Sequence, residues 1–284
     1  FGREAAISSG ANLYPVKKFN DISLEKIKIF LKNKKNKMHT KPSWEDNKMN
    51  VLIPMAGAGK RFFDAGYVFP KPLIEVKNKP MIQWVVESLN LKANYIFIIQ
   101  KEHQKKYNLK SVLNILKPGC RIIELDQLTE GAACTTLLAK KYINNNEPLI
   151  IANSDQYIDW NSSKAMYEFS SKNLDGAILT FEAIHPKWSY AKCDDKGFVT
   201  EVAEKKVISR NATVGVYYWK HGSDYVNSAE EMIRKNIRVN KEFYVCLTYN
   251  ELISKNKKIK IYKVNQMWGL GTPEDLNNFI QKNK

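Results

Sequence analysis

The chain has 284 residues and a mass of 32.8 kDa, which suits one domain of about 230 residues with a large core, plus an appendage. No stretch is long and apolar enough to cross a membrane, and the four scattered cysteines form no CxxC pair, so we expect reduced thiols in the cytoplasm. The net charge of +16 favours anionic partners, although a lysine- and asparagine-rich composition can also reflect the genome. Because no nucleic-acid-binding motif and no apolar membrane span is present, we expect neither nucleic acid nor a membrane as a partner.

Residues 1–48 have the composition of an appendage. They contain one predicted helix, at 21–31, and then a polar stretch rich in lysine and asparagine. We interpret them as the tail of a preceding domain plus a basic linker, and residues 49–284 as a separate, larger domain. This interpretation predicts that the chain belongs to a larger multi-domain protein.

From residue 49 onward, strand and helix patterns alternate as in βαβ units. Strands are expected at 50–54, 95–100, 121–125, 148–153 and 176–183, and helices at 81–89, 103–116, 131–142 and 162–171. The alternation then breaks at a predicted hairpin, 188–202, which is followed by strands at 213–219 and 259–264 and by helices at 223–235, 243–254 and 273–282. The order predicts an α/β fold: a doubly wound, Rossmann-like mixed sheet sandwiched by helices, with an inserted antiparallel portion.

A glycine-rich loop follows the first strand of this domain, where residues 55–61 read MAGAGKR. Small residues let the backbone pass close to a ligand and turn successive N–H groups toward an anion. Lys60, Arg61 and Lys71 would add full charges around a polyphosphate. An open α/β sheet binds its ligand at the carboxyl ends of its strands, where this loop lies. An ordinary strand-to-helix turn is the alternative.

Two common phosphate-binding motifs are excluded by single residues. The P-loop pattern fails because Pro54 stands at its first glycine and Arg61 at its Ser or Thr. The dinucleotide pattern begins at Gly57 and Gly59 but meets Phe62 at its third glycine. The loop must therefore belong to another class of phosphate-binding site.

AGAGKRF at 56–62 and PKPLIEVKNKPMI at 70–82 resemble two motifs of the sugar-phosphate nucleotidyltransferases, the nucleotide-sugar pyrophosphorylases with an NTP-transferase fold. The resemblance implies that the loop backbone holds the phosphates of an NTP. It also implies that Arg61 and Lys71 are catalytic and stabilise charge on the α-phosphate and the leaving pyrophosphate. Lys60 replaces the usual Thr or Ser. The nucleotide-binding candidates in the loop are Ala56, Gly57, Ala58, Gly59 and Lys60.

Asp155 follows the apolar run 148–153, which is typical of a strand buried on both faces. A carboxylate there lies where ligands bind, and its hard oxygens suit Mg²⁺ on a triphosphate. A helix cap or turn residue explains it equally well on local sequence. The family resemblance implies that Asp155 is the catalytic metal ligand and Mg²⁺ the cofactor. Asp159 is a weaker second candidate.

Glu130 and Gly131 resemble the family's segment before the helix that closes over the base. By this resemblance, Gly131 lets the backbone approach the base and ribose. Gln83 is a further candidate for the base, although a polar residue on an exposed helix face explains it as well. These three residues complete the predicted nucleotide site.

The predicted antiparallel portion carries the acceptor side. The sequence EVAEKK at 201–206 resembles the family's EKP element, which implies that Glu204 accepts hydrogen bonds from acceptor hydroxyls and that Lys205 pairs with the acceptor's phosphate. A solvated strand end is the alternative. Thr213 and Gly215 lie in a strand that resembles the family's next sugar-side element, so both are acceptor-binding candidates.

MWGLGTPEDL at 267–276 completes the resemblance, with Thr272 as helix cap and Pro273 at the first helical position. Relatives usually carry WxDxGT, whose Asp is the second metal ligand, and that position is Gly269 here. Three explanations stay open. One carboxylate and the phosphates hold Mg²⁺, a residue elsewhere supplies the second ligand, or the protein is not catalytic.

The resemblance covers residues 49–282 and implies a nucleotidyltransferase catalytic domain. Its expected partners are an NTP, with CTP or UTP favoured, and a phosphorylated small molecule, for which we favour a sugar phosphate over a polyol or choline phosphate. Pyrophosphate would be released and the product used for capsule or lipopolysaccharide precursors; a homo-oligomer is compatible with this. The alternatives are a non-catalytic nucleotide-sugar-binding subunit and a GT-A-like glycosyltransferase.

Overall fold

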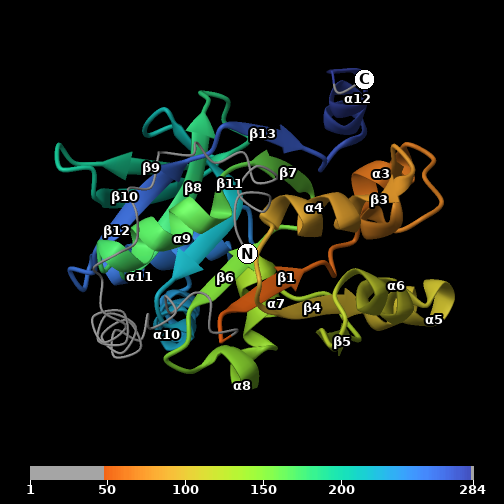
Figure 1. The fold of residues 1–284 in the computed structure, drawn as a ribbon, viewed down its shortest axis with the longest axis horizontal. Coiled ribbons are helices and arrows are strands. Elements are labelled where there is room, and N and C mark those ends of the chain that lie inside the picture. The colour runs from red at the N-terminus through yellow and green to blue at the C-terminus, as the bar shows by residue number, and fades with distance from the viewer. Residues whose placement is uncertain (1–47, 283–284) are drawn as a thin grey trace, which may run out of the picture. The chain divides into compact units, whose positions relative to one another are not determined.

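The computed structural model describes residues 48–282, and Figure 1 shows a central mixed sheet flanked by helices. Nine strands form this sheet, with seven of them in the order β10-β9-β11-β6-β1-β4-β5, and with β8 pairing β11 and β12. The strands are β1 (Asn50–Pro54), β4 (Asn94–Gln100), β5 (Arg121–Leu125), β6 (Leu149–Ala152), β8 (Gly176–Glu182), β9 (Ser189–Cys193), β10 (Val199–Glu204), β11 (Asn211–Trp219) and β12 (Ile259–Lys263).

The sheet has a parallel and an antiparallel half. β6, β1, β4 and β5 run parallel, whereas β11 runs antiparallel to β6, β8 and β9. β12 pairs parallel with β8, so the strands β9 to β11 are inserted between these two along the chain. The predicted Rossmann-like mixed α/β sheet is therefore confirmed, together with its antiparallel portion.

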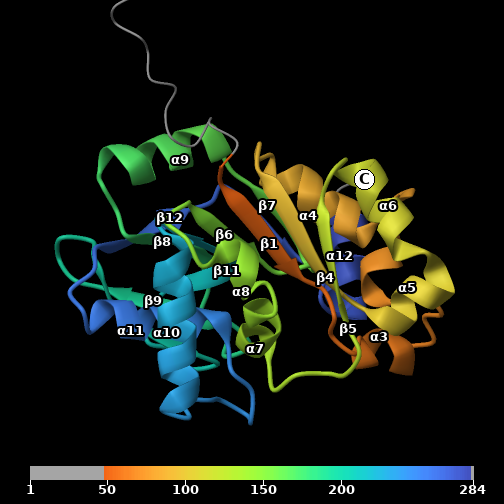
Figure 2. The same cartoon turned by 90° about the horizontal axis from the view of Figure 1, so that it is seen from below.

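Helices cover both faces of the sheet because its central strands are apolar on both sides. Val51 and Ile53 of β1 belong to one core cluster, and Leu52 between them belongs to the other. Figure 2 shows the helices of the first cluster above the sheet and those of the second below it. They are α4 (Met81–Leu89), α6 (Leu109–Leu116) and α9 (Ser162–Ser171) on the first face, and α7 (Ala132–Leu137), α8 (Lys140–Ile143), α10 (Gly222–Arg234) and α11 (Thr248–Ile253) on the second.

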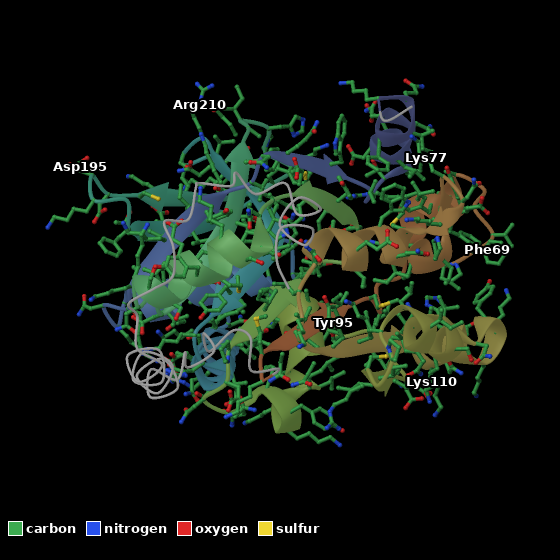
Figure 3. The ribbon with its side chains drawn as sticks, viewed as in Figure 1. Phe69, Lys77, Tyr95, Lys110, Asp195 and Arg210 are labelled. Atoms are coloured by element: carbon green, nitrogen blue, oxygen red, sulfur yellow. The ribbon has the colours of Figure 1, made fainter. Side chains whose placement is uncertain are left out.

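A third core cluster anchors the segment after the glycine-rich loop. Phe62 of α3 (Lys60–Asp64) is buried there against Leu276 and Phe279 of α12 (Pro273–Lys282). A 3-10 turn, η2 (Lys71–Leu73), and the short hairpin β2 (Glu75–Val76)–β3 (Lys79–Pro80) follow α3. Figure 3 labels Phe69 in the loop between α3 and η2, far from Asp195 at the tip of the β9–β10 hairpin.

The structure differs from the predicted elements mainly where helices break. The expected helix 103–116 is two helices, α5 (Lys101–Tyr107) and α6, because Asn108 adopts a left-handed conformation with φ +48°. The helix expected at 131–142 is split into α7 and α8, and the one expected at 243–254 begins with a 3-10 turn, η3 (Val245–Leu247). An unpredicted ribbon pairs β7 (Gln156–Asp159) with β13 (Gln266–Gly269).

Three further predictions concern the N-terminal appendage, membrane-spanning helices and the cysteines. The helix predicted at 21–31 and the linker lie outside the described residues. Within residues 48–282, no helix has the length and apolarity needed to cross a membrane. All four cysteines are free thiols in the structure.

Candidate active site

A cavity of about 320 Å³ lies beyond the carboxyl end of β6, between the two halves of the sheet. Its walls come from α3, from the segment after β6, from β10 and β11, and from the turn between β13 and α12. The fold therefore brings nucleotide-side and acceptor-side candidates into one space. The predicted site residues that line it are Arg61, Asp155, Glu204, Lys205, Thr213 and Gly215.

Asp155 lines this cavity and pairs with Lys71. Its carboxylate Oδ2 accepts a 2.8 Å hydrogen bond from Nζ of Lys71, and the two side chains are 28% and 23% exposed. A Cβ on Gly271 would lie 2.8 Å from the same Oδ2, so the glycine leaves the carboxylate its space. Lys71 comes from η2, 84 residues away in sequence, and the fold thus pairs two predicted catalytic residues.

The glycine-rich loop extends directly from β1, since the N–H of Met55 still bonds to the carbonyl of Ile98. The side-chain amide of Gln100 then donates to the carbonyls of Ala56 at 2.9 Å and Gly57 at 3.0 Å, which fixes the backbone. A Cβ on Gly57 would meet nothing within 4 Å, so the exposed loop is open to a ligand at this point. This open space around Gly57 is compatible with the predicted phosphate-binding role, which stays a prediction.

Other loop residues have distinct environments. Gly59 has φ +63° and caps α3, where Lys60 and Arg61 are exposed. Ala58 and Gly59 also line a smaller cavity of about 170 Å³, on the side of α5, which Lys71 reaches as well. The loop backbone is therefore accessible next to three basic side chains.

Gly131 approaches protein backbone more closely than the sequence suggested. Its φ is +126°, and a Cβ there would lie 2.5 Å from the nitrogen of Phe243. The N–H of Phe243 donates to the carbonyl of Glu130 at 2.8 Å, and the carbonyl of Phe243 accepts from Ala133 at 3.0 Å. This contact alone requires a glycine, so the expected approach to base and ribose is not needed to explain the residue. The next residue, Ala132, lines the large cavity.

Gln83 has a partner within its own helix. Its amide donates to Oε1 of Glu87 at 2.7 Å along α4, and Gln83 is not among the residues that line the larger cavity. Its contact with the base stays a prediction.

The side of the cavity formed by β10 and β11, where the acceptor-binding residues are predicted, contains the buried carboxylate of Glu204. Glu204 is 8% exposed, and its Oε2 accepts from the hydroxyl of Ser189 and, at 3.3 Å, from the thiol of Cys246. Burial raises the pKa of Glu204 above its ordinary 4.5. Burial and the neighbouring Glu204 carboxylate raise the pKa of Cys246 well above 9.0, so this residue remains a thiol and a donor.

Lys205 follows Glu204 in a left-handed conformation, with φ +53°. Its N–H donates to the carbonyl of Trp188 at 3.1 Å, and its ammonium donates to the hydroxyl of Tyr244 at 2.6 Å. The backbone conformation is uncommon for a residue with a Cβ, and the two hydrogen bonds explain how it is held. The ammonium is thereby placed on the cavity wall.

Thr213 and Gly215 shape the cavity from β11. The hydroxyl of Thr213 lies 3.0 Å from that of Tyr217, and Thr213 is 3% exposed. Gly215 has φ +78°, and a Cβ there would lie 2.3 Å from Nδ2 of Asn153. Gly215 is thus required by the packing of β11 against the segment that leads to Asp155.

These features agree with a direct comparison, in which the family model described as Nucleotidyl transferase matches residues 50–282. The chain belongs to the nucleotidyl transferase family. The resemblance inferred from the sequence motifs is therefore confirmed, and the match covers the described residues almost from end to end.

Curated relatives in this family share part of the chain. The mannose-1-phosphate guanyltransferase of Aspergillus oryzae is 29% identical over 152 residues, 49% of this chain and 39% of that protein. The bifunctional protein GlmU of Methanocaldococcus jannaschii is 24% identical over 233 residues, 80% of this chain and 52% of that protein. The chain thus spans about half, or less, of the length of these relatives.

Solved structures share the nucleotidyl transferase fold. The nucleoside-diphosphate-sugar pyrophosphorylase from Vibrio cholerae RC9 has a TM-score of 0.69 at 23% identity, covering 81% of this chain and 99% of that chain. The inositol-1-phosphate CTP transferase from T. maritima has a TM-score of 0.65 at 14% identity, covering 82% and 93%. At these identities the likeness establishes the fold.

The residues around Asp155 fit a magnesium ion that is held mainly by phosphates. Among residues 48–282, no three His, Cys, Asp or Glu side chains come together as a metal cage. Mg²⁺ often uses only one or two carboxylates with substrate phosphates and water, and Asp155 supplies one carboxylate on the cavity wall. Asp159 does not line the cavity; its carboxylate accepts from Asn265 at 3.4 Å.

Gly269, where the family usually has its second carboxylate, lies on the same wall. A Cβ there would be 3.3 Å from the Trp188 ring and 3.5 Å from Oδ2 of Asp275. Asp275 in turn accepts from the Thr272 hydroxyl at 2.9 Å and pairs with Lys187 at 3.0 Å. Neighbouring side chains thus occupy the space beside residue 269.

Sequence reasoning missed several cavity residues, because they come from segments without a recognisable motif. The tryptophan at 188 and the tyrosine at 244 follow the same apolar periodicity as core aromatics. The HPKWSY and EFYVC stretches contain no spacing that marks a site. The missed residues that line the cavity include Lys187, Trp188, Ser189, Tyr244, Cys246 and Asp275.

Proposed function

We propose that the protein is a sugar-phosphate nucleotidyltransferase, which joins an NTP to a phosphorylated acceptor and releases pyrophosphate. The observation that carries this proposal is the shared cavity, which Arg61 and Asp155 line together with Glu204 and Lys205. A transfer between two bound phosphate compounds requires such an arrangement. Mannose-1-phosphate guanyltransferases among the relatives support it.

In the proposed reaction, an oxygen of the acceptor's phosphate attacks the α-phosphorus of the NTP. The bond from the α-phosphorus to the bridging oxygen breaks, and pyrophosphate leaves with that electron pair. The attacking oxygen is already anionic, so the protein needs no general base. Its tasks are to position two anions and to stabilise the charge that develops between them.

Each basic residue has a place in this scheme. The loop backbone at Gly57 would bind NTP phosphates, while Arg61 and Lys71 stabilise the α-phosphate and the leaving group. Lys71 is already held at 2.8 Å from Asp155. Mg²⁺, when bound by Asp155, would neutralise phosphate charge. Lys205 would bind the acceptor's phosphate, and Glu204 would accept hydrogen bonds from its hydroxyls.

The base and the pathway are finer proposals. The relatives and structural neighbours include a guanyltransferase, a UDP-glucose pyrophosphorylase and a CTP transferase. We propose CTP or UTP as the nucleotide, capsule or lipopolysaccharide precursor synthesis as the role, and the cytoplasm as the location. A homo-oligomer and an upstream domain remain predictions.

Pyrophosphate release with Mg²⁺ tests the proposal. CTP, UTP, dTTP, GTP and ATP would be crossed with a panel of phosphate monoesters. We expect release that needs one NTP and one acceptor together. A glycosyltransferase would release no pyrophosphate in this panel, but would release a nucleoside diphosphate when a nucleotide-sugar and a sugar acceptor are supplied, and that pair of results would contradict the proposal.

Gly269 favours one other candidate function, a non-catalytic subunit that binds nucleotide-sugars, because the family's usual second carboxylate is absent there. Such a subunit would bind a nucleotide-sugar and release no pyrophosphate with any pair. Turnover that depends on Mg²⁺ would exclude it.

A further inference from the structure

A second cavity, of about 260 Å³, lies at the far end of two strands that also lead to the large cavity. It is formed where β6 begins, where β11 ends and where α9 ends. The large cavity lies beyond the other ends of β6 and β11. No residue in the described part of the chain lines both cavities, so the fold contains two separate spaces.

The floor of this second cavity is aromatic and apolar. Phe169 of α9 and Tyr218 of β11 lie there with their ring centres 4.9 Å apart, and Leu174 lies beside them. Their exposed fractions are 2%, 6% and 2%, so the rest of each side chain is packed in the core. A flat or apolar part of a ligand fits such a floor, because it adds to an existing hydrophobic surface.

The floor also carries one unused hydrogen-bond donor, the hydroxyl of Tyr218. This hydroxyl bonds to no residue between 48 and 282, although Tyr218 is only 6% exposed. Burial raises the pKa of Tyr218 to about 12, so the phenol is neutral and keeps its hydrogen. Because buried polar groups are nearly always hydrogen-bonded, a donor of this kind on a cavity floor is suited to an acceptor that enters the cavity.

A basic rim lies next to this donor. Lys220 is two positions after Tyr218, so both side chains lie on the same face of the chain, whereas Trp219 between them packs in the other core cluster. The ammonium of Lys220 donates to Oδ1 of Asn173 at 2.8 Å, which leaves two of its three hydrogens for a ligand.

The overall charge around the cavity favours an anion. Lys48 supplies a second ammonium on the rim, and His221 lines the cavity as well. Glu147 is the one carboxylate among the described lining residues. Two lysines, a histidine and a neutral hydroxyl therefore meet a single acidic side chain.

We propose that this cavity is a second ligand site, which binds a phosphate monoester whose organic part is flat or apolar. The phosphate accepts hydrogen bonds from the ammonium of Lys220 and the hydroxyl of Tyr218, and the organic part lies against Phe169. A phosphate offers three terminal oxygens and up to two negative charges, which match these donors better than a single carboxylate does. The site is independent of the proposed transferase reaction.

Phenyl phosphate is the probe, because its ring matches the floor and its phosphate matches the rim. Isothermal titration calorimetry measures its binding to the full chain as wild type, Tyr218→Phe and Lys220→Met. The first variant removes only a hydroxyl, and the second removes a charge while keeping the aliphatic stem. We expect each to weaken binding about tenfold, because a hydrogen bond to a charged group is lost.

Two control variants test the location of the bound probe. Lys164→Met removes an exposed lysine of α9 that does not line this cavity, and it should leave the affinity unchanged. Lys205→Met removes a lysine of the large cavity and should also leave binding at the second site unchanged.

A ligand series tests the chemical class with the wild type alone, so it is informative even where a variant folds poorly. Benzyl alcohol keeps a ring without a charge, and benzoate keeps a ring with one carboxylate. We expect both to bind about tenfold more weakly than phenyl phosphate, because each lacks part of the charge and of the acceptor oxygens.

Three results would overturn the inference. Phenyl phosphate binding that is lost in Lys205→Met and kept in Lys220→Met would place the probe in the large cavity. Equal affinity for phenyl phosphate and benzyl alcohol would show that the site does not recognise phosphate. Absence of binding to the wild type would show that the cavity is not a ligand site. None of these measurements involves pyrophosphate release, so the proposed function is tested separately.

Discussion

Replacement of Gly131 by alanine tests whether this glycine serves the fold or the nucleotide. The family resemblance implies that it lets the backbone approach base and ribose. The structure shows a different close approach, in which an added Cβ would lie 2.5 Å from the nitrogen and 2.6 Å from the oxygen of Phe243. Real Cβ atoms do not approach backbone atoms this closely, so one of the two segments must move.

The expected loss of stability has two parts. Holding alanine at φ +126° costs about 1–3 kcal/mol. Relieving the overlap with backbone, which cannot rotate away as a side chain can, costs about 1–3 kcal/mol more. The sum, about 2–6 kcal/mol, is a large part of the roughly 5–15 kcal/mol that stabilises a typical domain.

Urea unfolding followed by far-UV circular dichroism measures this loss, and Gly119→Ala is the matched control. Gly119 also has a positive φ, +76°, but a Cβ there would meet nothing within 4 Å. Gly119→Ala should therefore lose only the free energy that it costs to hold alanine at a positive φ, about 1–2 kcal/mol of unfolding free energy. Equal losses in the two variants would refute the packing argument. A stable Gly131→Ala protein with a raised KM for the NTP would assign the glycine to the nucleotide instead.

Three further outcomes are expected. Lys71→Ala should lower kcat by about 10²- to 10³-fold with an unchanged circular dichroism spectrum, because a cation held against Asp155 is lost; an active variant would remove Lys71 from catalysis. Gly57→Ala should leave the urea midpoint nearly unchanged, since a Cβ meets nothing within 4 Å, yet raise the KM for the NTP; an unchanged KM would mean that phosphates do not approach there. Glu204→Gln should weaken acceptor binding and change the pH dependence of stability. Because burial raises the folded pKa of Glu204 above 4.5, the contribution of Glu204 to stability is fully present below 4.5 and is lost as pH rises through the raised value, whereas thermal unfolding of the variant should lack this loss.

The parallel half of the fold was predictable because its information is local. Continuous apolar runs such as 148–153 identify strands buried on both faces, and the structure places β6 there. The exceptions are single residues that break a helix. Asn108 takes a left-handed conformation at φ +48°, and the periodicity of the flanking residues hides this because it continues on both sides.

Long-range pairing could not be predicted in the same way. β7 and β13 are short and partly polar, and each lacks a strand pattern of its own. They pair with each other across more than a hundred residues of chain, with Trp268 opposite Tyr157, and Figure 1 shows them as neighbouring strands. This ribbon has a functional consequence, since it carries Gly269 and precedes Gly271, which leaves space for Asp155.

The residues of the candidate site also fall into two groups, those that sequence motifs predict and those that only the structure reveals. Arg61, Asp155 and Glu204 lie in motifs whose order along the chain could be recognised, and the structure gathers them in one cavity. Tyr244 and Trp188 could not be recognised, because an aromatic residue at core spacing gives the same signal whether it faces the core or a ligand. Only the three-dimensional contacts, such as the bond from Lys205 to Tyr244, distinguish the two.

Gly269 shows why a departure from a family motif has to be judged with its neighbours. By sequence alone it is a missing carboxylate. In the structure, the space beside it is bounded by Trp188 and by the Asp275–Lys187 ion pair. A Cβ at 269 would lie 3.5 Å from Oδ2 of Asp275, so an aspartate there would place a second carboxylate beside that of Asp275, and like charges at such close range repel. Glycine at 269 therefore leaves room for the Trp188 ring and places no further negative charge beside the Asp275–Lys187 ion pair.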